Sequence, residues 1–243
     1  MKKNIAISTW SNPETLSRAA AHFFVLNAQR CIAEKDRFIV ALSGGSTPRR
    51  LYQLLATPEF SRNINWEKVF LFWSDERFVE HTHADSNYRM VKENLLDHIP
   101  LPAENIFAIP VNTTPKKDAA RYERSIRKFF KKEKVVFDWV LLGIGKDGHT
   151  ASLFPGSSSL EEKDKLVTGA WQEEKQSHRI SFTLPLINDA ANIIFLVAGK
   201  EKTAIVSSVI GHKKIKPPLP AQLVRPKRGL LFWMLDEEAA AKI

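Results

Sequence analysis

The sequence has 243 residues, of which 44% are hydrophobic, and its formal net charge is +9. This length and composition predict one domain, spanning residues 1–243, with a full buried core. They exclude a disulfide-stabilised scaffold, because Cys31 has no second cysteine to pair with, and a helical membrane protein, because no apolar run approaches the roughly 20 residues of a membrane span.

The N-terminus begins Met-Lys-Lys-Asn-Ile-Ala-Ile, a short basic start with no long apolar run or small-residue cleavage site after it. We therefore expect no signal peptide. A single cysteine suits a reducing compartment, so the expected location is the cytoplasm.

The pattern along the chain alternates between apolar runs typical of buried strands and stretches typical of helices. Strands are expected at 38–42, 69–73, about 106–109, 137–142, about 165–170, 179–184, 192–197 and 230–235. Helices are expected from residue 11 or 12 to about 34, and at 48–56, about 86–96, 117–132 and 200–210. Because the strands are apolar on both faces and separated by helices, the pattern predicts an α/β fold with a Rossmann-like open, mostly parallel sheet flanked by helices on both faces.

The loop Ser43–Pro48 follows the first predicted strand and offers successive small residues ahead of a helix. Free backbone N–H groups and the helix dipole make such a place an anion site, for phosphate above all. The loop is not a Walker loop, because no Gly-Lys-Ser/Thr follows, nor a nucleophile elbow, because Pro48 occupies the last glycine's place. A plain turn between strand and helix is the alternative.

Residues 74–77 form a polar loop, Ser-Asp-Glu-Arg, directly after the apolar strand 69–73. At the carboxyl edge of a sheet, Arg77 could bind phosphate with two hydrogen bonds, and Asp75 could orient a neighbouring side chain. An exposed surface triplet is the alternative. A metal site is not predicted here, because His81 and His83 near Asp85 lack a partner cluster at ligand spacing.

A second glycine-rich loop follows the predicted strand 137–142 and presents Asp147 and His149. A histidine at the carboxyl end of a strand lies where open α/β sheets bind their ligands. Gly143–Gly148 formally fits the dinucleotide fingerprint Gly-x-Gly-x-x-Gly. The match is weak, because that fingerprint needs a long helix after it and Pro155 with Gly156 cuts the helix short.

Two stretches concentrate the positive charge: Arg121–Lys134 and His212–Arg228, the second with six Lys or Arg and no acid. Neither interleaves aromatic and basic residues in a nucleic-acid reader module, so no specific nucleic-acid partner is expected. The favoured interpretation is a pair of solvated faces that also attract an anionic small substrate.

Several blocks of the sequence resemble the 6-phosphogluconolactonase family, in the expected order from about residue 12 to 241. The most specific block is Leu142–Pro155, with Asp-Gly-His-Thr-Ala-Ser-Leu-Phe-Pro at its end. The loop Ser43–Pro48 and the pair Ser74–Arg77 and 85–87 are also similar, as are stretches at 179–183, 199–202 and 219–224. The glucosamine-6-phosphate deaminases share the fold, but typically carry Asn-Glu-Pro where this chain has Leu-Phe-Pro155.

The resemblance implies hydrolysis of 6-phospho-D-glucono-1,5-lactone to 6-phospho-D-gluconate in the oxidative pentose phosphate route, with glucose-6-phosphate dehydrogenase supplying the substrate. The lactone carbonyl is already activated, so a general base acting on water suffices and neither a cofactor nor a metal is expected. His149 is the expected base, and Asp75 is the second catalytic candidate. The expected substrate- and phosphate-binding residues are Gly44, Gly45, Ser46, Thr47, Arg77, Gly145, Asp147, Gly148, Arg179 and Lys202.

Two other functions stay open at this point. One is the isomerase-deaminase activity of the same fold, which would release ammonia from glucosamine 6-phosphate. The other is a sugar-phosphate sensor or basic nucleic-acid partner without catalytic activity.

Overall fold

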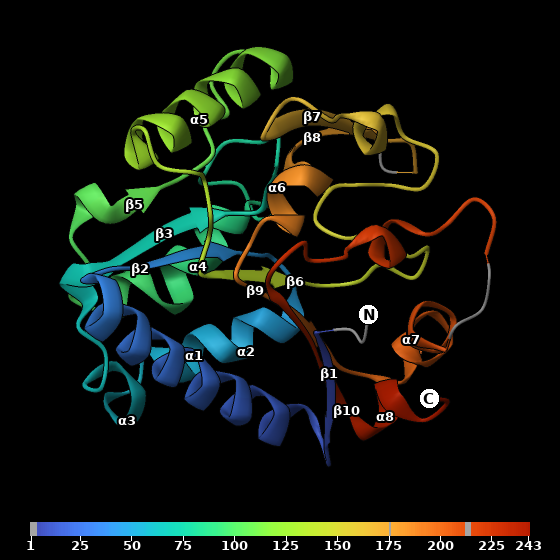
Figure 1. Cartoon of the computed structure of the whole chain (residues 1–243), viewed down its shortest axis with the longest axis horizontal. Helices are drawn as coiled ribbons and strands as arrows, with labels where there is room; N and C mark the ends of the chain where they lie inside the picture. The colour runs from blue at the N-terminus through green and yellow to red at the C-terminus, as the bar shows by residue number, and fades with distance from the viewer. Residues whose placement is uncertain (1–3, 175, 212–214) are drawn as a thin grey trace.

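The computed structural model describes residues 4–174, 176–211 and 215–243, which contain a seven-stranded sheet in the order β1-β10-β9-β6-β2-β3-β5 (Figure 1). Each neighbouring pair of strands in this sheet is parallel. The strands are β1 (Ile5–Trp10), β2 (Phe38–Leu42), β3 (Val69–Trp73), β5 (Ile106–Phe107), β6 (Trp139–Leu142), β9 (Asn192–Val197) and β10 (Leu230–Asp236). The predicted open, mostly parallel sheet of an α/β fold is confirmed.

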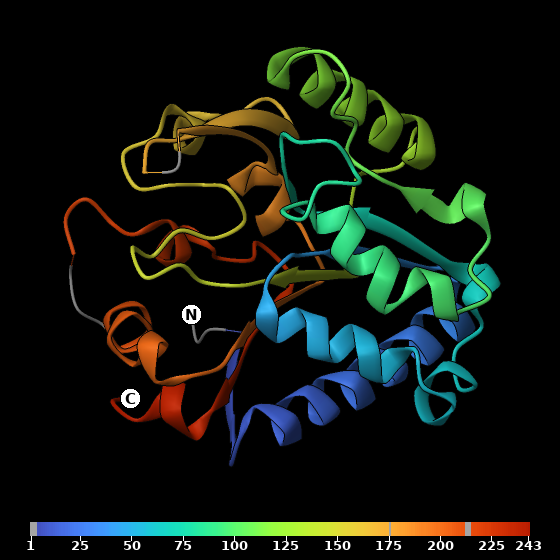
Figure 2. The ribbon, with the colours of Figure 1, turned by 180° about the vertical axis from the view of Figure 1, so that it is seen from behind.

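Helices lie on both sides of the sheet, with α1 and α2 on one side and α5 and α6 on the other (Figure 1). From behind, α4 is seen alongside α2, against which it packs (Figure 2). The α-helices are α1 (Pro13–Lys35), α2 (Ser46–Leu55), α3 (Pro58–Ser61), α4 (Asn87–Asn94), α5 (Pro115–Phe130), α6 (Leu184–Asn188), α7 (Thr203–Ile210) and α8 (Glu237–Ala240). Short 3₁₀ turns lie at 66–68, 96–98, 103–105, 158–161, 200–202 and 220–223.

Helix α1 shows how local sequence and core packing agree. Asn12 caps its start, because the Asn12 side chain accepts the Thr15 N–H at 2.9 Å and the Thr15 hydroxyl accepts the Asn12 N–H at 3.2 Å. Its buried face includes Phe24, whose ring centroid lies 5.2 Å from that of Phe38 in β2 and 5.6 Å from that of Trp139 in β6. The helix thus covers the centre of the sheet.

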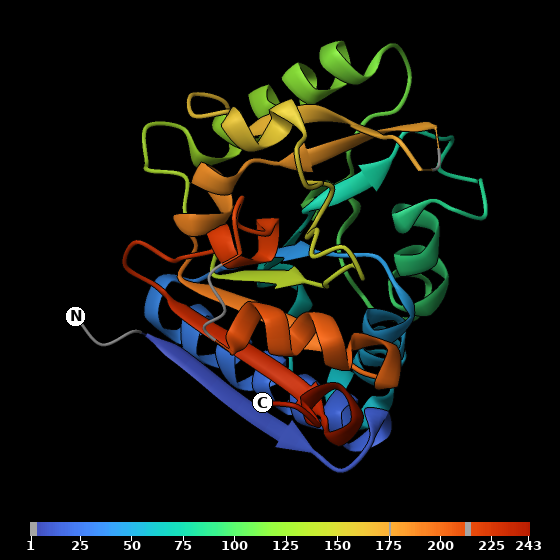
Figure 3. The same ribbon diagram turned by 90° about the vertical axis from the view of Figure 1, so that its right-hand side faces the viewer.

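Strand β1 was not predicted from the sequence. It lies parallel to β10 at the edge of the sheet, where its residues are largely exposed (Figure 3). Its residues Ala6, Ser8 and Thr9 give it no continuous apolar run, because an edge strand with little burial does not need one.

A second, three-stranded antiparallel sheet has the order β4-β8-β7, and it corrects three expectations. The polar loop predicted at 74–77 contains β4 (Asp75–Arg77). The strands expected near 165–170 and at 179–184 exist as β7 (Val167–Gln172) and β8 (Ser177–Phe182), but outside the parallel sheet. Antiparallel strands tolerate polar residues on one face, which is why this sheet holds Asp and Arg side chains.

The order of strands places two loops at a switch point of the sheet. The chain runs from β2 outward through β3 and β5, then returns to β6 on the other side of β2. Ligands of open α/β sheets bind beyond the carboxyl ends of the strands at such a point. The loops that follow β2 and β6 are the two glycine-rich loops; the first comprises residues 43–45, before α2, and the second includes residues 143–148.

Candidate active site

A cavity of about 300 Å³ lies at the carboxyl ends of four neighbouring strands, β9, β6, β2 and β3. This volume suits a small-molecule ligand. The small sheet, the start of α4 and the turn at 200–202 complete its walls. Its lining is Ser43, Gly44, Gly45, Ser46, Thr47, Pro48, Asp75, Arg77, Asn87, Gly143, Ile144, Gly145, His149, Ala151, Ser152, Phe154, Gln172, Arg179, Leu196, Val197, Ala198 and Lys202.

The first glycine-rich loop brings the N-terminus of α2 to the cavity. Helix α2 begins at Ser46, two residues before the predicted start, and Gly45 precedes it with φ of 117° and no side-chain cap. The first N–H groups of a helix have no partner within the helix, so they are available to an anion. A Cβ on Gly44 would lie 1.8 Å from the Asn87 Oδ1 atom, so a larger residue there would displace the Asn87 side chain.

The small sheet places two arginines side by side at the cavity. Arg77 of β4 pairs directly with Arg179 of β8 in the antiparallel register. The Arg77 guanidinium donates to the Asp85 carbonyl at 2.7 Å, and the Arg179 guanidinium donates to the Gln172 side chain at 2.8 Å. Burial, together with the neighbouring Arg77 charge, lowers the pKa of Arg179. Two close cations with capacity to donate further hydrogen bonds suit an anion such as phosphate.

Asp75 also faces the cavity, and it connects three segments of the site. The Ser152 hydroxyl donates to Asp75 Oδ2 at 2.7 Å, and the Asn87 amide donates to the Asp75 carbonyl at 2.9 Å. The Ser152 N–H in turn donates to the Ser181 hydroxyl of β8 at 3.1 Å. The segment just after the second glycine-rich loop is therefore hydrogen-bonded to the small sheet next to Asp75.

The second glycine-rich loop holds the imidazole of His149 in a defined orientation. The His149 Nδ1 atom lies 2.6 Å from Asp147 Oδ1, and the His149 backbone N–H donates to the same oxygen at 3.1 Å. Burial opposes ionisation of Asp147, but the hydrogen bond and charge of His149 hold the pKa of Asp147 below its usual range. The His149 Nε2 atom has no hydrogen-bond partner among the described residues.

The backbone of this loop is shaped by two glycines. A Cβ on Gly145 would lie 2.0 Å from His149 Nδ1, so only glycine leaves room for the ring. Gly148 has a φ of 83°, a conformation that favours glycine, and its carbonyl accepts the Ala221 N–H at 3.0 Å. Lys202 lies across the loop, where its ammonium donates to the Ile144 carbonyl at 2.9 Å.

The structure brings most of the predicted site residues to one cavity. Asp147 and Gly148 lie outside its lining; Asp147 contacts His149, and Gly148 shapes the loop. The predicted residues in the lining are Gly44, Gly45, Ser46, Thr47, Asp75, Arg77, Gly145, His149, Arg179 and Lys202.

Comparison with known proteins identifies the family of this chain. Residues 11–233 match the family described as glucosamine-6-phosphate isomerases/6-phosphogluconolactonase. The chain belongs to this family. It is 40% identical over 216 residues to a 6-phosphogluconolactonase of Nostoc sp., with 87% of each chain covered, and 37% identical over 236 residues to one of Synechocystis sp., with 96% and 95% covered. The solved 6-phosphogluconolactonase of Trypanosoma cruzi superposes with a TM-score of 0.89 at 28% identity, covering 100% of this chain and 98% of that one.

Several lining residues of this family member were missed as functional candidates. Ser43, Asn87 and Ser152 stand inside the blocks that carried the resemblance, so their position was a usable signal. Gln172 had no such signal, because only the pairing of β7 with β8 brings it beside Arg179. Glu76, which lies behind the lining and not in it, was given no role in the sequence analysis, yet it is 1% exposed.

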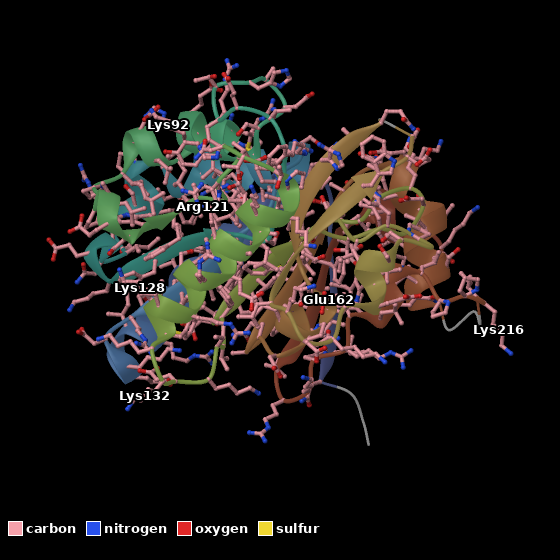
Figure 4. All side chains as sticks on the ribbon, turned by 90° about the horizontal axis from the view of Figure 1, so that it is seen from above. Lys92, Arg121, Lys128, Lys132, Glu162 and Lys216 are labelled. Carbon is pink, nitrogen blue, oxygen red and sulfur yellow. The ribbon has the colours of Figure 1, made fainter. Side chains whose placement is uncertain are left out.

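Other charged features lie apart from the cavity. Arg121, Lys128 and Lys132 project from α5 and the residues just after it (Figure 4) and are exposed, as expected for a solvated face. Of the second basic stretch, residues 212–214 lie outside the described residues. His83 and Asp85 approach to 3.9 Å, and within the described part of the chain no three His, Cys, Asp or Glu side chains gather in a way that could hold a metal ion. None of the described helices could span a membrane.

Proposed function

We propose that the chain hydrolyses 6-phospho-D-glucono-1,5-lactone to 6-phospho-D-gluconate, the second step of the oxidative pentose phosphate route. The observation that carries the proposal is the presence, in one cavity, of the Asp147-supported imidazole of His149 and the paired arginines Arg77 and Arg179. The names of the relatives support the same substrate.

The phosphate end of the substrate meets the N-terminus of α2, with cationic side chains around it. Backbone N–H groups at Ser46 and Thr47 would donate to phosphate oxygens, and the helix dipole favours the negative charge. Arg77, Arg179 and Lys202 supply charge-assisted hydrogen bonds. This binding is remote from the reacting carbon, so its free energy can orient the lactone carbonyl toward His149.

The reaction needs one group that accepts and then returns a proton. With Nδ1–H donating to Asp147, the His149 Nε2 atom accepts a proton from water as the water oxygen bonds to the lactone carbonyl carbon. Backbone N–H groups of the glycine-rich loops can stabilise the resulting oxyanion. The bond from that carbon to the ring oxygen then breaks, and Nε2–H protonates the ring oxygen. General-base catalysis of this kind contributes about 10²–10⁴-fold in rate.

Asp75 is the second catalytic candidate, in a supporting role. Asp75 is only 8% exposed and its carboxylate already accepts the Ser152 hydroxyl, so it is held in place at the cavity wall. We assign it contacts to sugar hydroxyls and the orientation of Ser152. We also propose a cytoplasmic location and a supply of lactone from glucose-6-phosphate dehydrogenase.

The deciding experiment mixes the protein with freshly generated 6-phosphogluconolactone and measures hydrolysis above the spontaneous rate. A clear acceleration supports the proposal. Ammonia release from glucosamine 6-phosphate would instead indicate the deaminase activity of the family. Binding of 6-phosphogluconate without turnover of either substrate would indicate a sensor.

A further inference from the structure

Glu76 is a buried carboxylate directly behind the cavity wall. It lies between Asp75 and Arg77 in β4, and because successive side chains of a strand point to opposite faces, it points away from the cavity that its neighbours line. It is 1% exposed. Neither the proposed mechanism nor the phosphate site uses it.

Both oxygens of Glu76 are occupied by donors from the main chain. Oε1 accepts the N–H groups of Arg77 and Asn87, each at 2.7 Å. Oε2 accepts the Tyr88 N–H at 2.8 Å and the Ser86 hydroxyl at 3.1 Å. Three of these four donors lie at the start of α4, so the carboxylate joins the first turn of that helix to strand β4.

This junction fixes Arg77 at its backbone and at its side chain. The Arg77 backbone N–H donates to Glu76, and the Arg77 guanidinium donates to the carbonyl of Asp85, the residue before Ser86. Asn87, whose N–H is also bound by Glu76, donates its side-chain amide to Asp75. Loosening the carboxylate would therefore move the Arg77 main chain and the Asp85 carbonyl relative to each other.

We propose that Glu76 is a positioning residue for phosphate recognition: it sets the affinity for the phosphorylated end of the substrate by holding Arg77 in place, without touching the substrate. This inference rests on the proposed function, in which Arg77 contacts phosphate. Burying a carboxylate is costly unless hydrogen bonds compensate it, and the four donors offset part of that cost here.

Only a carboxylate of this length fits the junction. A glutamine would present an N–H₂ group toward one set of N–H donors, and an aspartate is one methylene too short to reach the same partners. Glu76→Gln therefore disrupts the junction with little change in volume. Ser86→Ala removes one of the four donors and serves as a milder variant should Glu76→Gln fail to fold.

Asp138 provides a matched control. It is a buried carboxylate, 2% exposed, that accepts the Ile39 N–H at 2.9 Å and pairs with Lys35, but it lies at the start of β6, at the opposite end of the strands from the cavity. Asp138→Asn therefore removes a buried carboxylate whose hydrogen bonds do not involve Arg77.

The experiment measures kcat and KM for 6-phosphogluconolactone and for unphosphorylated gluconolactone, together with thermal unfolding. Glu76→Gln is expected to raise KM for the phosphorylated lactone about tenfold or more, while kcat/KM for gluconolactone stays within about twofold of wild type. Ser86→Ala should show the same selectivity with a smaller rise. Asp138→Asn should leave both KM values unchanged, whatever it does to the melting temperature.

Equal losses on both lactones in Glu76→Gln, or no kinetic change at all, would overturn the proposal and leave Glu76 a structural residue. A second readout separates this failure from that of the proposed function. Calorimetric binding of inorganic phosphate requires no turnover, so weaker binding in Glu76→Gln but not in Asp138→Asn would support the positioning role even in a protein without lactonase activity. Unchanged phosphate binding would contradict it.

Discussion

Arg77 of β4 stands directly opposite Arg179 of β8, and both line the same cavity. Like charges at opposite positions of an antiparallel pair destabilise a sheet. The two arginines nevertheless occupy these positions. Arg77 donates a hydrogen bond to the Asp85 carbonyl, and Arg179 donates one to the Gln172 side chain. The nearby carboxylates of Asp75 and Asp85 offset part of this repulsion. In the proposed function, phosphate bound between the two guanidinium groups would offset more of it.

The proposed base is tested by His149→Ala. This change should lower kcat about 10²–10⁴-fold and leave KM nearly unchanged, because the base acts in the transition state. Steady-state kinetics with 6-phosphogluconolactone measure the effect. His98→Ala is the control, since His98 is exposed and bonded to the Glu93 carbonyl outside the cavity. A wild-type kcat in His149→Ala would remove this residue from the mechanism.

The phosphate site is tested by Arg77→Ala and Lys202→Ala. Each should raise KM for the phosphorylated lactone about tenfold or more, because a hydrogen bond to a charged group is worth about 1.5–3 kcal/mol. Hydrolysis of unphosphorylated gluconolactone should change far less. Lys128→Ala, on the exposed face of α5, is the charge-matched control and should change neither. An equal loss of activity on the two lactones would instead show that Arg77 and Lys202 have a structural role and do not recognise phosphate.

Independence from metal ions follows from the chemistry of the substrate. The lactone carbonyl is activated, and the proton transfer assigned to His149 requires no Lewis acid. Activity should therefore persist after exhaustive treatment with EDTA and without any added nucleotide. The assay compares initial rates before and after chelation. Loss of turnover that a divalent ion restores would refute this expectation.

Glu76 should make stability depend on pH in a defined direction. Burial raises the pKa of Glu76 to about 7 from an ordinary value of 4.5, against the lowering effect of the Asn87, Tyr88 and Arg77 N–H groups. Between these two pH values the folded protein holds a proton that the unfolded chain releases. The contribution is therefore fully present below pH 4.5 and is lost as pH rises through about 7.

Urea unfolding of wild type and Glu76→Gln across this range measures that contribution. The free energy of unfolding of wild type, relative to the variant, should fall as pH rises from about 4.5 to 7 and level off above it. A constant difference between the two proteins would mean that Glu76 titrates at its ordinary pKa when folded. Asp138→Asn again controls for the loss of a buried carboxylate.

The sequence predicted the parallel sheet and the two glycine-rich loops because both depend on local patterns. The strand 192–197 was placed at its observed bounds, since a run of apolar residues buried on both faces has few alternatives. Strand β1 escaped prediction because an exposed edge needs no apolar run. The antiparallel pairing of Arg77 with Arg179 was equally hidden, because contacts between residues so far apart leave no local pattern in one sequence.

The same contrast applies to the role of single residues. His149 stood out through its glycine-rich surroundings, whereas Gln172 and Glu76 acquire their partners only from the tertiary structure. Buried polar junctions of this kind are specified by geometry rather than by composition.

The loop from Gly145 to His149 contains the whole of the proposed proton-transfer unit: the glycine that leaves room for the ring, the carboxylate that orients it and the imidazole itself. The proposed anion-binding groups, in contrast, are contributed by distant segments around residues 45, 77, 179 and 202, which line the cavity. Mild heating or partial loosening of the fold should thus weaken ligand capture before it impairs the chemical step. A chain organised this way can also acquire a new ligand through changes in remote loops while its proton-transfer unit is inherited intact.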